Sequence, residues 1–212
     1  MSRIVPAILT DNPEALETMV RQVETFTDYV QIDIMDGQFV PSSSITWQHL
    51  ASIPFKFAWE AHLMIVNPEE HLAGFRQAGA QRIIFHYEAT SSPREVISLA
   101  RSYHLEVGLA VNPETPVSAI LPLVGEVDSV LFLSVNPGFY GSEFIPGVLD
   151  KIVELNKLRP GVVTGIDGGA KESNIAEIAG TGVSYICVGS AIFRQLEPAA
   201  SFRRLKTLAE TG

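Results

Sequence analysis

The feature that most constrains the fold is a regular alternation of short apolar runs with segments whose apolar residues recur at helical spacing. The apolar runs predict eight strands, at residues 4–9, 30–35, 55–64, 82–86, 106–111, 129–135, 162–167 and 185–188. The intervening segments predict helices at residues 13–25, 47–51, 68–79, 93–103, 117–123, 146–158, 174–179 and from 198 onward. Eight units in 212 residues average 212/8, or about 26 residues, without a linker or a change of composition.

Strict alternation of strands and helices indicates parallel strands, because parallel neighbours are joined by crossover helices. Eight units favour a closed (β/α)8 barrel, the TIM-barrel architecture, over an open doubly wound sheet, which is the remaining alternative. With 46% hydrophobic residues, the chain can form one substantial core. We therefore predict an α/β protein whose single barrel domain spans residues 1–212.

Charge and hydropathy exclude several classes of partner. Fifteen basic against 24 acidic residues give a net charge of −9, which disfavours nucleic acid and anionic membranes as partners. No uncharged apolar run approaches the ~18 residues of a membrane span, and no secretory signal is visible at the N-terminus. The lone cysteine, Cys187, lies in an apolar run and is interpreted as a core residue. We expect a cytoplasmic protein.

The second predicted strand carries an unusual polar face. Val30, Ile32 and Ile34 alternate with Gln31, Asp33 and Met35, so one face is apolar and the other holds an amide, a carboxylate and a thioether. A carboxylate inside a strand is costly unless it is paired. Asp33 and the nearby Asp36 could simply cap the strand end. A functional role is favoured because Asp167 ends the seventh predicted strand in the same way.

In a barrel of this type the active site lies at the C-terminal ends of the strands. The helix-facing side of each strand should be apolar, so Gln31, Asp33 and Met35 are expected to point inward. By the same alternation, Glu60, His62 and Met64 share one face of the third strand. A lone histidine on a strand is usually a core residue. With Asp33 and Asp167 nearby, a metal site or an acid/base site becomes the better interpretation.

Glycine-rich turns follow the last three predicted strands. Each could be ordinary turn chemistry, but together they favour a phosphate site built from backbone amides, as is frequent after strands seven and eight of such barrels. A local cradle would also allow so acidic a protein to bind an anion. The candidate phosphate-binding residues are Gly138, Gly141, Gly168, Gly169, Gly189 and Ser190.

These motifs, taken in order, resemble those of the ribulose-phosphate 3-epimerase family, which implies a ribulose-phosphate-binding TIM barrel. The resemblance covers essentially the whole chain. It rests on the segments Ile32-Asp33-Ile34-Met35-Asp36-Gly37, Ala61-His62-Leu63-Met64, Phe85-His86-Tyr87-Glu88-Ala89, Ser134-Val135-Asn136-Pro137-Gly138-Phe139, Ile166-Asp167-Gly168-Gly169 and Val188-Gly189-Ser190-Ala191-Ile192-Phe193.

The resemblance implies a divalent metal (Zn, Fe, Mn or Co) held by two histidines and two aspartates, with the aspartates also acting as acid and base. Asp33, His62 and Asp167 match three of these four positions. Gln31 stands where the family has its other histidine, and an amide oxygen is a weaker ligand than imidazole. The metal is therefore expected to bind weakly, to be a harder ion, or to be absent.

Three smaller departures from the family pattern concern the substrate-binding residues. Thr10 replaces a serine near the end of the first strand and keeps its hydroxyl. Leu133 stands at a position where methionine is common, and Tyr140 replaces a glycine of the phosphate loop. With Thr10, the residues expected to contact the substrate are His62, Met35 and Met64.

The implied reaction is epimerisation of ribulose 5-phosphate to xylulose 5-phosphate. Asp33 and Asp167 would move the proton on opposite faces of the substrate, and a metal or His62 would hold the enediolate charge. Met35 and Met64 would exclude water, although both could be plain core residues. A structural role is favoured for His86. The expected partner is a small phosphorylated ketose, and we also expect a homo-oligomer.

Three alternatives stay open at this point. Related barrel decarboxylases and hexulose-phosphate synthases have a lysine two residues after the first aspartate, where this chain has Met35, so that interpretation is poor. The substrate could be another ketose phosphate, such as a hexulose 6-phosphate. Because Gln31 replaces a metal ligand, the chain could also bind a phosphosugar without catalysis.

Overall fold

The computed structural model, which describes residues 2–138 and 142–212, contains one closed barrel of parallel strands in chain order. Its strands are β1 (Arg3–Ile8), β2 (Tyr29–Met35), β3 (Ala58–Met64), β4 (Arg82–His86), β5 (Glu106–Val111), β6 (Ser129–Leu133), β7 (Thr164–Asp167) and β8 (Tyr185–Val188). The ring closes where β1 pairs with β8, with Arg3 opposite Tyr185. The predicted (β/α)8 barrel is confirmed.

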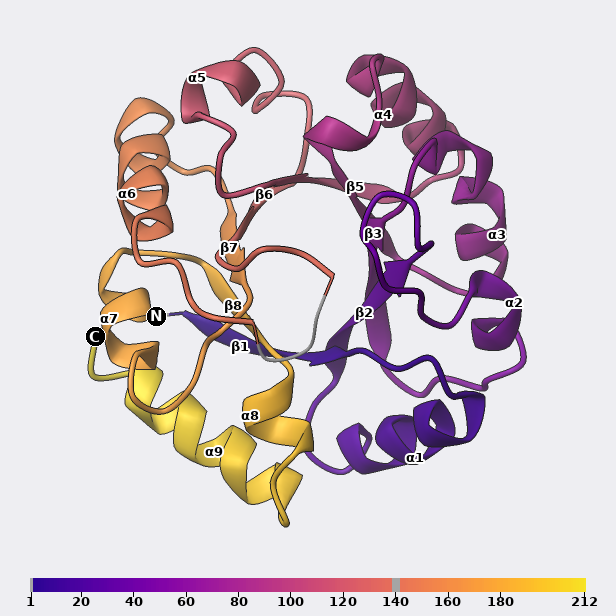
Figure 1. Ribbon diagram of the computed structural model, residues 1–212, viewed down its shortest axis with the longest axis vertical. Coiled ribbons are helices and arrows are strands. Elements are labelled where there is room, and N and C mark those ends of the chain that lie inside the picture. Colours follow the sequence, from indigo (N-terminus) through magenta and orange to yellow (C-terminus); the bar gives the residue numbers. More distant parts are fainter. Residues whose placement is uncertain (1, 139–141) are drawn as a thin grey trace.

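Helices surround this barrel on the outside (Figure 1). They are α1 (Pro13–Val23), α2 (Trp47–Leu50), α3 (Leu72–Gln77), α4 (Pro93–Ser102), α5 (Val117–Ile120), α6 (Val148–Leu158), α7 (Ile175–Gly180), α8 (Ser190–Phe193) and α9 (Pro198–Ala209). Two short 3-10 helices, η1 (Pro68–Glu70) and η2 (Tyr87–Ala89), follow β3 and β4. The last helix, α9, packs on α7 and α8.

Two layers of buried side chains result from the strand pleat. Val30, Ile32 and Ile34 belong to the large core between barrel and helices. A separate cluster that includes Val5 and Ile84 fills the barrel interior. Because alternate residues of a strand face opposite ways, the residues between those of the outer layer point into the barrel. The polar face predicted for the second strand therefore faces inward.

The first helix shows how local sequence sets these elements. The Asn12 side chain accepts hydrogen bonds from the backbone N–H groups of Glu14 (2.8 Å) and Ala15 (3.1 Å), which caps the helix. Pro13 occupies the first helical position, where its missing N–H costs nothing. Leu16 is fully buried against the barrel. The predicted start of this helix is confirmed.

Several boundaries differ from the predictions. The third strand begins at Ala58 instead of residue 55, because Phe55 packs from a loop against Trp59, with ring centroids 5.2 Å apart. The sixth strand ends at Leu133. The predicted helix 68–79 is divided into η1 and α3, and the short helix α8 was not predicted.

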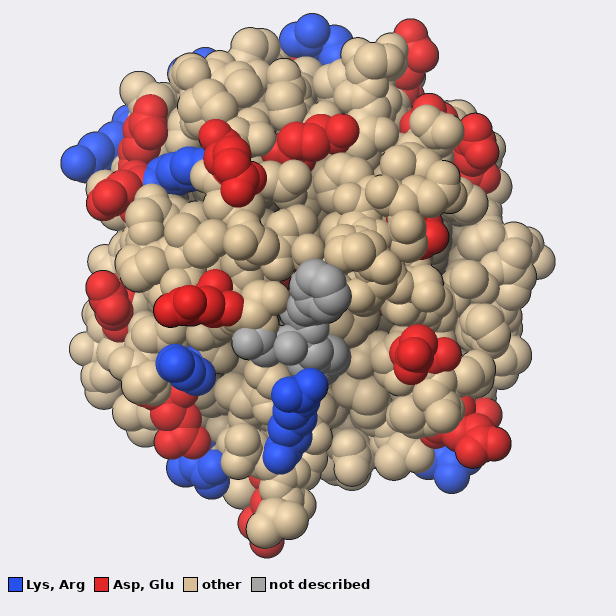
Figure 2. All heavy atoms as spheres, viewed as in Figure 1, with Lys and Arg blue, Asp and Glu red and all other residues tan. Residues whose placement is uncertain are grey.

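The described part of the chain contains no helix that combines the length and the apolarity needed to cross a membrane. Figure 2 shows the acidic side chains dispersed over one face of the molecule, with no large basic patch among the atoms that this view displays. On this face, therefore, the acidic residues do not form a single acidic patch.

Candidate active site

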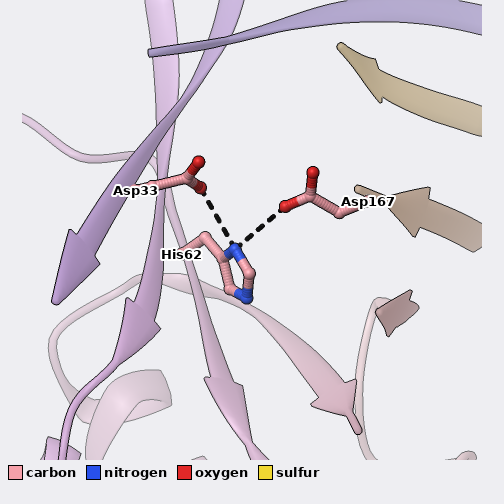
Figure 3. Close-up of side chains that lie close together, drawn as sticks. All are labelled: Asp33, His62 and Asp167. Atoms are coloured by element: carbon pink, nitrogen blue, oxygen red, sulfur yellow. Dashed lines mark hydrogen bonds and ion pairs between the residues drawn. The ribbon is translucent and has the colours of Figure 1, made fainter. Parts of the chain in front are cut away.

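Three side chains from strands far apart in the sequence meet inside the barrel. His62 Nδ1 lies 3.1 Å from Asp33 Oδ1 and 3.2 Å from Asp167 Oδ2. Figure 3 shows both carboxylates directed at this one nitrogen. The strand register sets the meeting, because Asp33 pairs with His62 across β2 and β3, and Asp167 ends β7. The structure thus brings together the two candidate acids and the candidate histidine.

Gln31 lies directly beneath the two acids and is fully buried. Its amide nitrogen donates to Asp33 Oδ1 (2.8 Å) and to Asp167 Oδ2 (2.7 Å). Its amide oxygen accepts from the Cys187 thiol, 3.0 Å away. Cys187 is a buried core residue, as expected, and it also supports this polar cluster.

The other ring nitrogen of His62 is held by a second histidine. His62 Nε2 lies 2.9 Å from His86 Nε2, and both rings are fully buried. Burial lowers the pKa of His86, so this ring stays neutral and accepts the hydrogen bond from His62. His86 Nδ1 then faces Glu88 Oε2 at 3.5 Å, beyond good hydrogen-bond distance.

A proton is retained among the three central groups. Burial alone would lower the pKa of His62, but its hydrogen bonds to Asp167 and Asp33, and their charges, raise that pKa to about 10. Burial, followed by the charge of Asp167, raises the pKa of Asp33. His62 Nδ1 contacts both carboxylates at once, so we assign the proton to this nitrogen near neutral pH.

A pocket opens above this cluster at the C-terminal ends of the strands. Asp33 and Asp167 line it together with Met35, Met64 and Leu133. Both methionines are almost fully buried and pack with Val40, Leu9 and Phe39 in one apolar cluster. They therefore form an apolar wall beside the two carboxylates.

The glycine turn after β7 lines the same pocket with Gly168, Gly169 and Ala170. Ser134 Oγ donates to the Gly168 carbonyl (2.7 Å), and Asn174 Nδ2 donates to the Gly169 carbonyl (3.1 Å). In a trans peptide the following N–H points away from the carbonyl, so the amides of Gly169 and Ala170 point away from these two donors. Gly168 and Gly169 have φ of +105° and +69°, which side-chain-bearing residues rarely adopt.

The other candidate phosphate residues lie around this turn. Gly138, Gly189 and Ser190 line the same pocket as Gly168 and Gly169, and Gly189 precedes the short helix α8. Gly141 lies outside the described residues. The five described candidates thus line one pocket, whereas the fully buried His62 does not line it.

Thr10 does not line this pocket. It lines a neighbouring hollow that shares Leu9, Met35 and Gly138 with it. The Thr10 hydroxyl accepts a hydrogen bond from the Asn12 backbone N–H at 3.1 Å, so it helps to begin α1. Its contact with a substrate stays a prediction.

Four residues that support the site were not assigned to it from the sequence. His86 and Cys187 hold His62 and Gln31, and Ser134 and Asn174 orient the glycine turn. The position of His86 and Ser134 in the sequence could have indicated such a role, because both stand at the ends of their strands nearest the barrel mouth. Barrel closure sets the partners of His86, Cys187 and Ser134, whereas Asn174 bonds to Gly169 in its own loop.

The central cluster has donors suited to a divalent ion. Donor atoms about 2.1 Å from one ion at tetrahedral or octahedral angles are about 3.0–3.4 Å apart. The separations of 3.1 and 3.2 Å between His62 Nδ1 and the two carboxylates fall in this range. Asp33, His62 and Asp167 therefore fit a metal. Gln31 does not complete the set as it is oriented, because an amide N–H cannot coordinate a cation.

Comparisons with known proteins agree with this geometry. The model of the ribulose-phosphate 3 epimerase family matches residues 3–193. The chain belongs to this family. It is 35% identical to the ribulose-phosphate 3-epimerase of Aquifex aeolicus, over 98% of this chain and 97% of the relative. It is 34% identical to that of Schizosaccharomyces pombe, over 93% of this chain and 89% of the relative.

Solved structures confirm the architecture. KGPDC from Streptococcus mutans superimposes with a TM-score of 0.77 at 12% identity, covering 99% of this chain and 97% of that protein. The 3-hexulose-6-phosphate synthase from Salmonella typhimurium gives 0.73 at 18% identity, covering 99% and 100%. At such identities the likeness concerns the barrel alone.

Proposed function

We propose that this protein interconverts D-ribulose 5-phosphate and D-xylulose 5-phosphate by moving the proton on C3. The observation that carries the proposal is the position of Asp33 and Asp167 on one pocket, both in contact with His62, in a chain that matches its family over residues 3–193. The enzyme is an isomerase that acts on carbohydrates. The proposal treats residues 1–212 as one catalytic domain.

Epimerisation needs one ionised acid to remove the C3 proton and one protonated acid to return a proton to the other face. Asp33 and Asp167 supply two carboxyl groups on strands that are separated in the barrel by β1 and β8. Burial raises the pKa of Asp33, which makes this carboxylate a better acceptor for the proton that His62 Nδ1 holds between the two acids. The roles of the two acids exchange when the reaction runs in the opposite direction.

The enediolate intermediate carries negative charge that must be held without water. The imidazolium of His62 supplies a positive charge next to both acids, and its orientation is fixed by His86. Met35 and Met64 form an apolar wall of the pocket and exclude water from the two acids. A divalent ion bound by Asp33, His62 and Asp167 would polarise the substrate oxygens as a Lewis acid.

The phosphate of the substrate would bind at the glycine turn after β7. The amides of Gly169 and Ala170 point away from Ser134 and Asn174, and both residues line the pocket. A cradle of backbone amides binds an anion locally and needs no basic surface. This supports phosphate recognition by a protein with a net charge of −9.

The alternatives are less well supported. Met35 lies in the apolar wall of the pocket, so the lysine of the decarboxylases has no counterpart there. The binding-only alternative is disfavoured because both acids line the pocket. The relatives in Aquifex and Schizosaccharomyces are named for a ribulose phosphate, which favours the pentulose over a hexulose 6-phosphate. A cytoplasmic location and a homo-oligomeric state stay predictions.

The test is to incubate the purified protein with ribulose 5-phosphate in deuterated water and to follow exchange of the C3 proton by NMR. Replacing either acid, as Asp33→Asn or Asp167→Asn, should slow exchange by about 10²–10⁴-fold while the circular dichroism spectrum is preserved. The matched control is Asp150→Asn at an exposed position on α6, which should leave exchange unchanged.

Each outcome of this experiment is informative. Wild-type exchange in either Asn variant would remove that aspartate from the mechanism. No exchange by the wild-type protein, with ribulose 5-phosphate or with hexulose 6-phosphates, would overturn the proposed activity. Faster exchange with a hexulose 6-phosphate would retain the mechanism and change the substrate.

A further inference from the structure

The Gln31 side chain joins both candidate acids through a single amide nitrogen. Its nitrogen lies 2.8 Å from Asp33 Oδ1 and 2.7 Å from Asp167 Oδ2. These are the same two carboxylate oxygens that contact His62 Nδ1. An amide nitrogen carries two hydrogens, so it can donate one to each carboxylate at the same time.

The orientation of this amide is determined by its surroundings. With the amide reversed, its oxygen would face the oxygens of Asp33 and Asp167 at less than 3 Å, both of them acceptors, and the donor His62 Nδ1 would lie farther away at 3.4 Å. As it stands, the nitrogen donates to two ionisable acceptors, and such charge-assisted hydrogen bonds are stronger than neutral ones. The amide oxygen contacts the Cys187 thiol, which is both a weak donor and a weak acceptor. This contact therefore favours neither orientation of the amide strongly.

A cation in the cluster would reverse this preference. A cation held jointly with His62 Nδ1 would draw on Asp33 Oδ1 and Asp167 Oδ2, the carboxylate oxygens that contact this nitrogen and that now accept hydrogen bonds from Gln31. An N–H group beside a cation is repelled. To act as a ligand, Gln31 would have to present its oxygen, which requires a half-turn of the amide and loss of both hydrogen bonds. In the present orientation the amide therefore competes with a metal for the two carboxylates.

We propose that Gln31 is a built-in competitor of the metal: its amide cross-links Asp33 and Asp167 in the metal-free protein and weakens divalent-ion binding at the Asp33–His62–Asp167 cluster. The cross-link also keeps the two carboxylates at a fixed separation when no ion joins them. The inference rests on the proposed function only for the role of the two acids.

This proposal differs from the simpler view that Gln31 is a poor ligand. A poor ligand contributes weakly to metal binding, so its removal weakens binding further. A competitor opposes metal binding, so its removal strengthens it. Gln31→Leu separates the two views, because leucine has a similar volume and neither donates nor coordinates.

The experiment titrates the EDTA-treated and dialysed protein with Co²⁺ and Zn²⁺ by calorimetry, and follows the Co²⁺ absorption spectrum as a second readout. We expect Gln31→Leu to bind both ions about 10-fold more tightly than the wild type. Gln31→His adds an imidazole donor and should tighten binding by about 100-fold or more. The matched control, Gln22→Leu on exposed α1 surface, should bind as the wild type does.

Equal or weaker metal binding by Gln31→Leu, in a variant whose circular dichroism spectrum is native, would overturn the proposal. A second measurement uses the wild-type protein, so it does not depend on whether Gln31→Leu folds. The Gln31 side-chain amide hydrogens should exchange slowly with solvent in EDTA, and the signals should shift when Zn²⁺ is added. Fast exchange in EDTA would also overturn the proposal. Because no substrate is present, these outcomes are separate from failure of the proposed epimerase activity.

Discussion

The charge of His62 makes the stability of the metal-free protein depend on pH. Its pKa is about 10 in the folded protein, against 6.5 for an ordinary histidine. A folded-state pKa above the unfolded value gives stability that is complete below pH 6.5 and is lost as the pH rises through about 10. Each pH unit between these values costs up to about 1.4 kcal/mol, so the loss between pH 7 and 9 is about 2–3 kcal/mol.

This loss can be measured by urea unfolding at pH 7 and pH 9 in the presence of EDTA. Few other groups titrate in this range, and burial raises the pKa of Cys187, which adds a small loss of the same sign near pH 9. His62→Gln should flatten most of the dependence, and nitrogen NMR of the wild-type ring should show both nitrogens protonated at pH 8. Equal stability at the two pH values, or a neutral His62 at pH 7, would show that the two carboxylates do not hold a charged His62 in the folded protein.

Two further predictions concern the residues around the cluster. Gly168→Ala should raise KM for ribulose 5-phosphate by about 10-fold or more with a smaller effect on kcat, because φ is +105° there and an added Cβ would lie 2.5 Å from a Val135 methyl; steady-state kinetics would show this, and an unchanged KM would contradict it. His86→Leu removes the acceptor for His62 Nε2 and should lower kcat by about 10–100-fold, whereas His86→Gln keeps an acceptor and should restore part of it; equal rates in the two variants would contradict a positioning role.

The pleat of β2 could be predicted because both of its faces carry a clear signal. Three β-branched residues on one side fix which face packs on the helices, so the inward direction of Gln31, Asp33 and Met35 follows. The alternative role as a cap holds for Asp36 instead, whose carboxylate accepts from the backbone N–H groups of Gln38 (2.8 Å) and Val66 (2.8 Å).

The contacts between strands could not be predicted in the same way. The polar atoms of His86 and Ser134 find their partners only after the barrel closes. The partner of His86 is His62, 24 residues away, and the partner of Ser134 is Gly168, 34 residues away. The direction of the Gln31 amide depends on three side chains from β2, β7 and β8. No local pattern of residue types contains this information.

Boundary errors have a related cause. An apolar residue just outside a strand gives the same signal as one inside it, so Phe55 and Phe57 extended the predicted third strand toward the N-terminus. In the structure they pack against each other at 5.5 Å from a loop. At the end of β6, Ser134 donates its N–H to the Asp167 carbonyl at 2.7 Å and shares its hydroxyl hydrogen between the carbonyls of Asp167 (2.9 Å) and Gly168 (2.7 Å). These contacts anchor the turn instead of extending the strand.

The register of β2 against β3 connects the folding of the chain to its chemistry. Gln31 pairs with Glu60, Asp33 with His62, and Met35 with Met64, so successive inward layers are polar, ionisable and apolar toward the mouth. A shift of β2 by one residue would turn Ile32 and Ile34 inward and would turn Gln31 and Asp33 outward to the helix layer. Burial of the apolar face of β2 is sufficient to oppose such a shift. The hydrophobic pattern that selects the register is therefore also what aims the acid, its histidine and the water-excluding wall at one pocket.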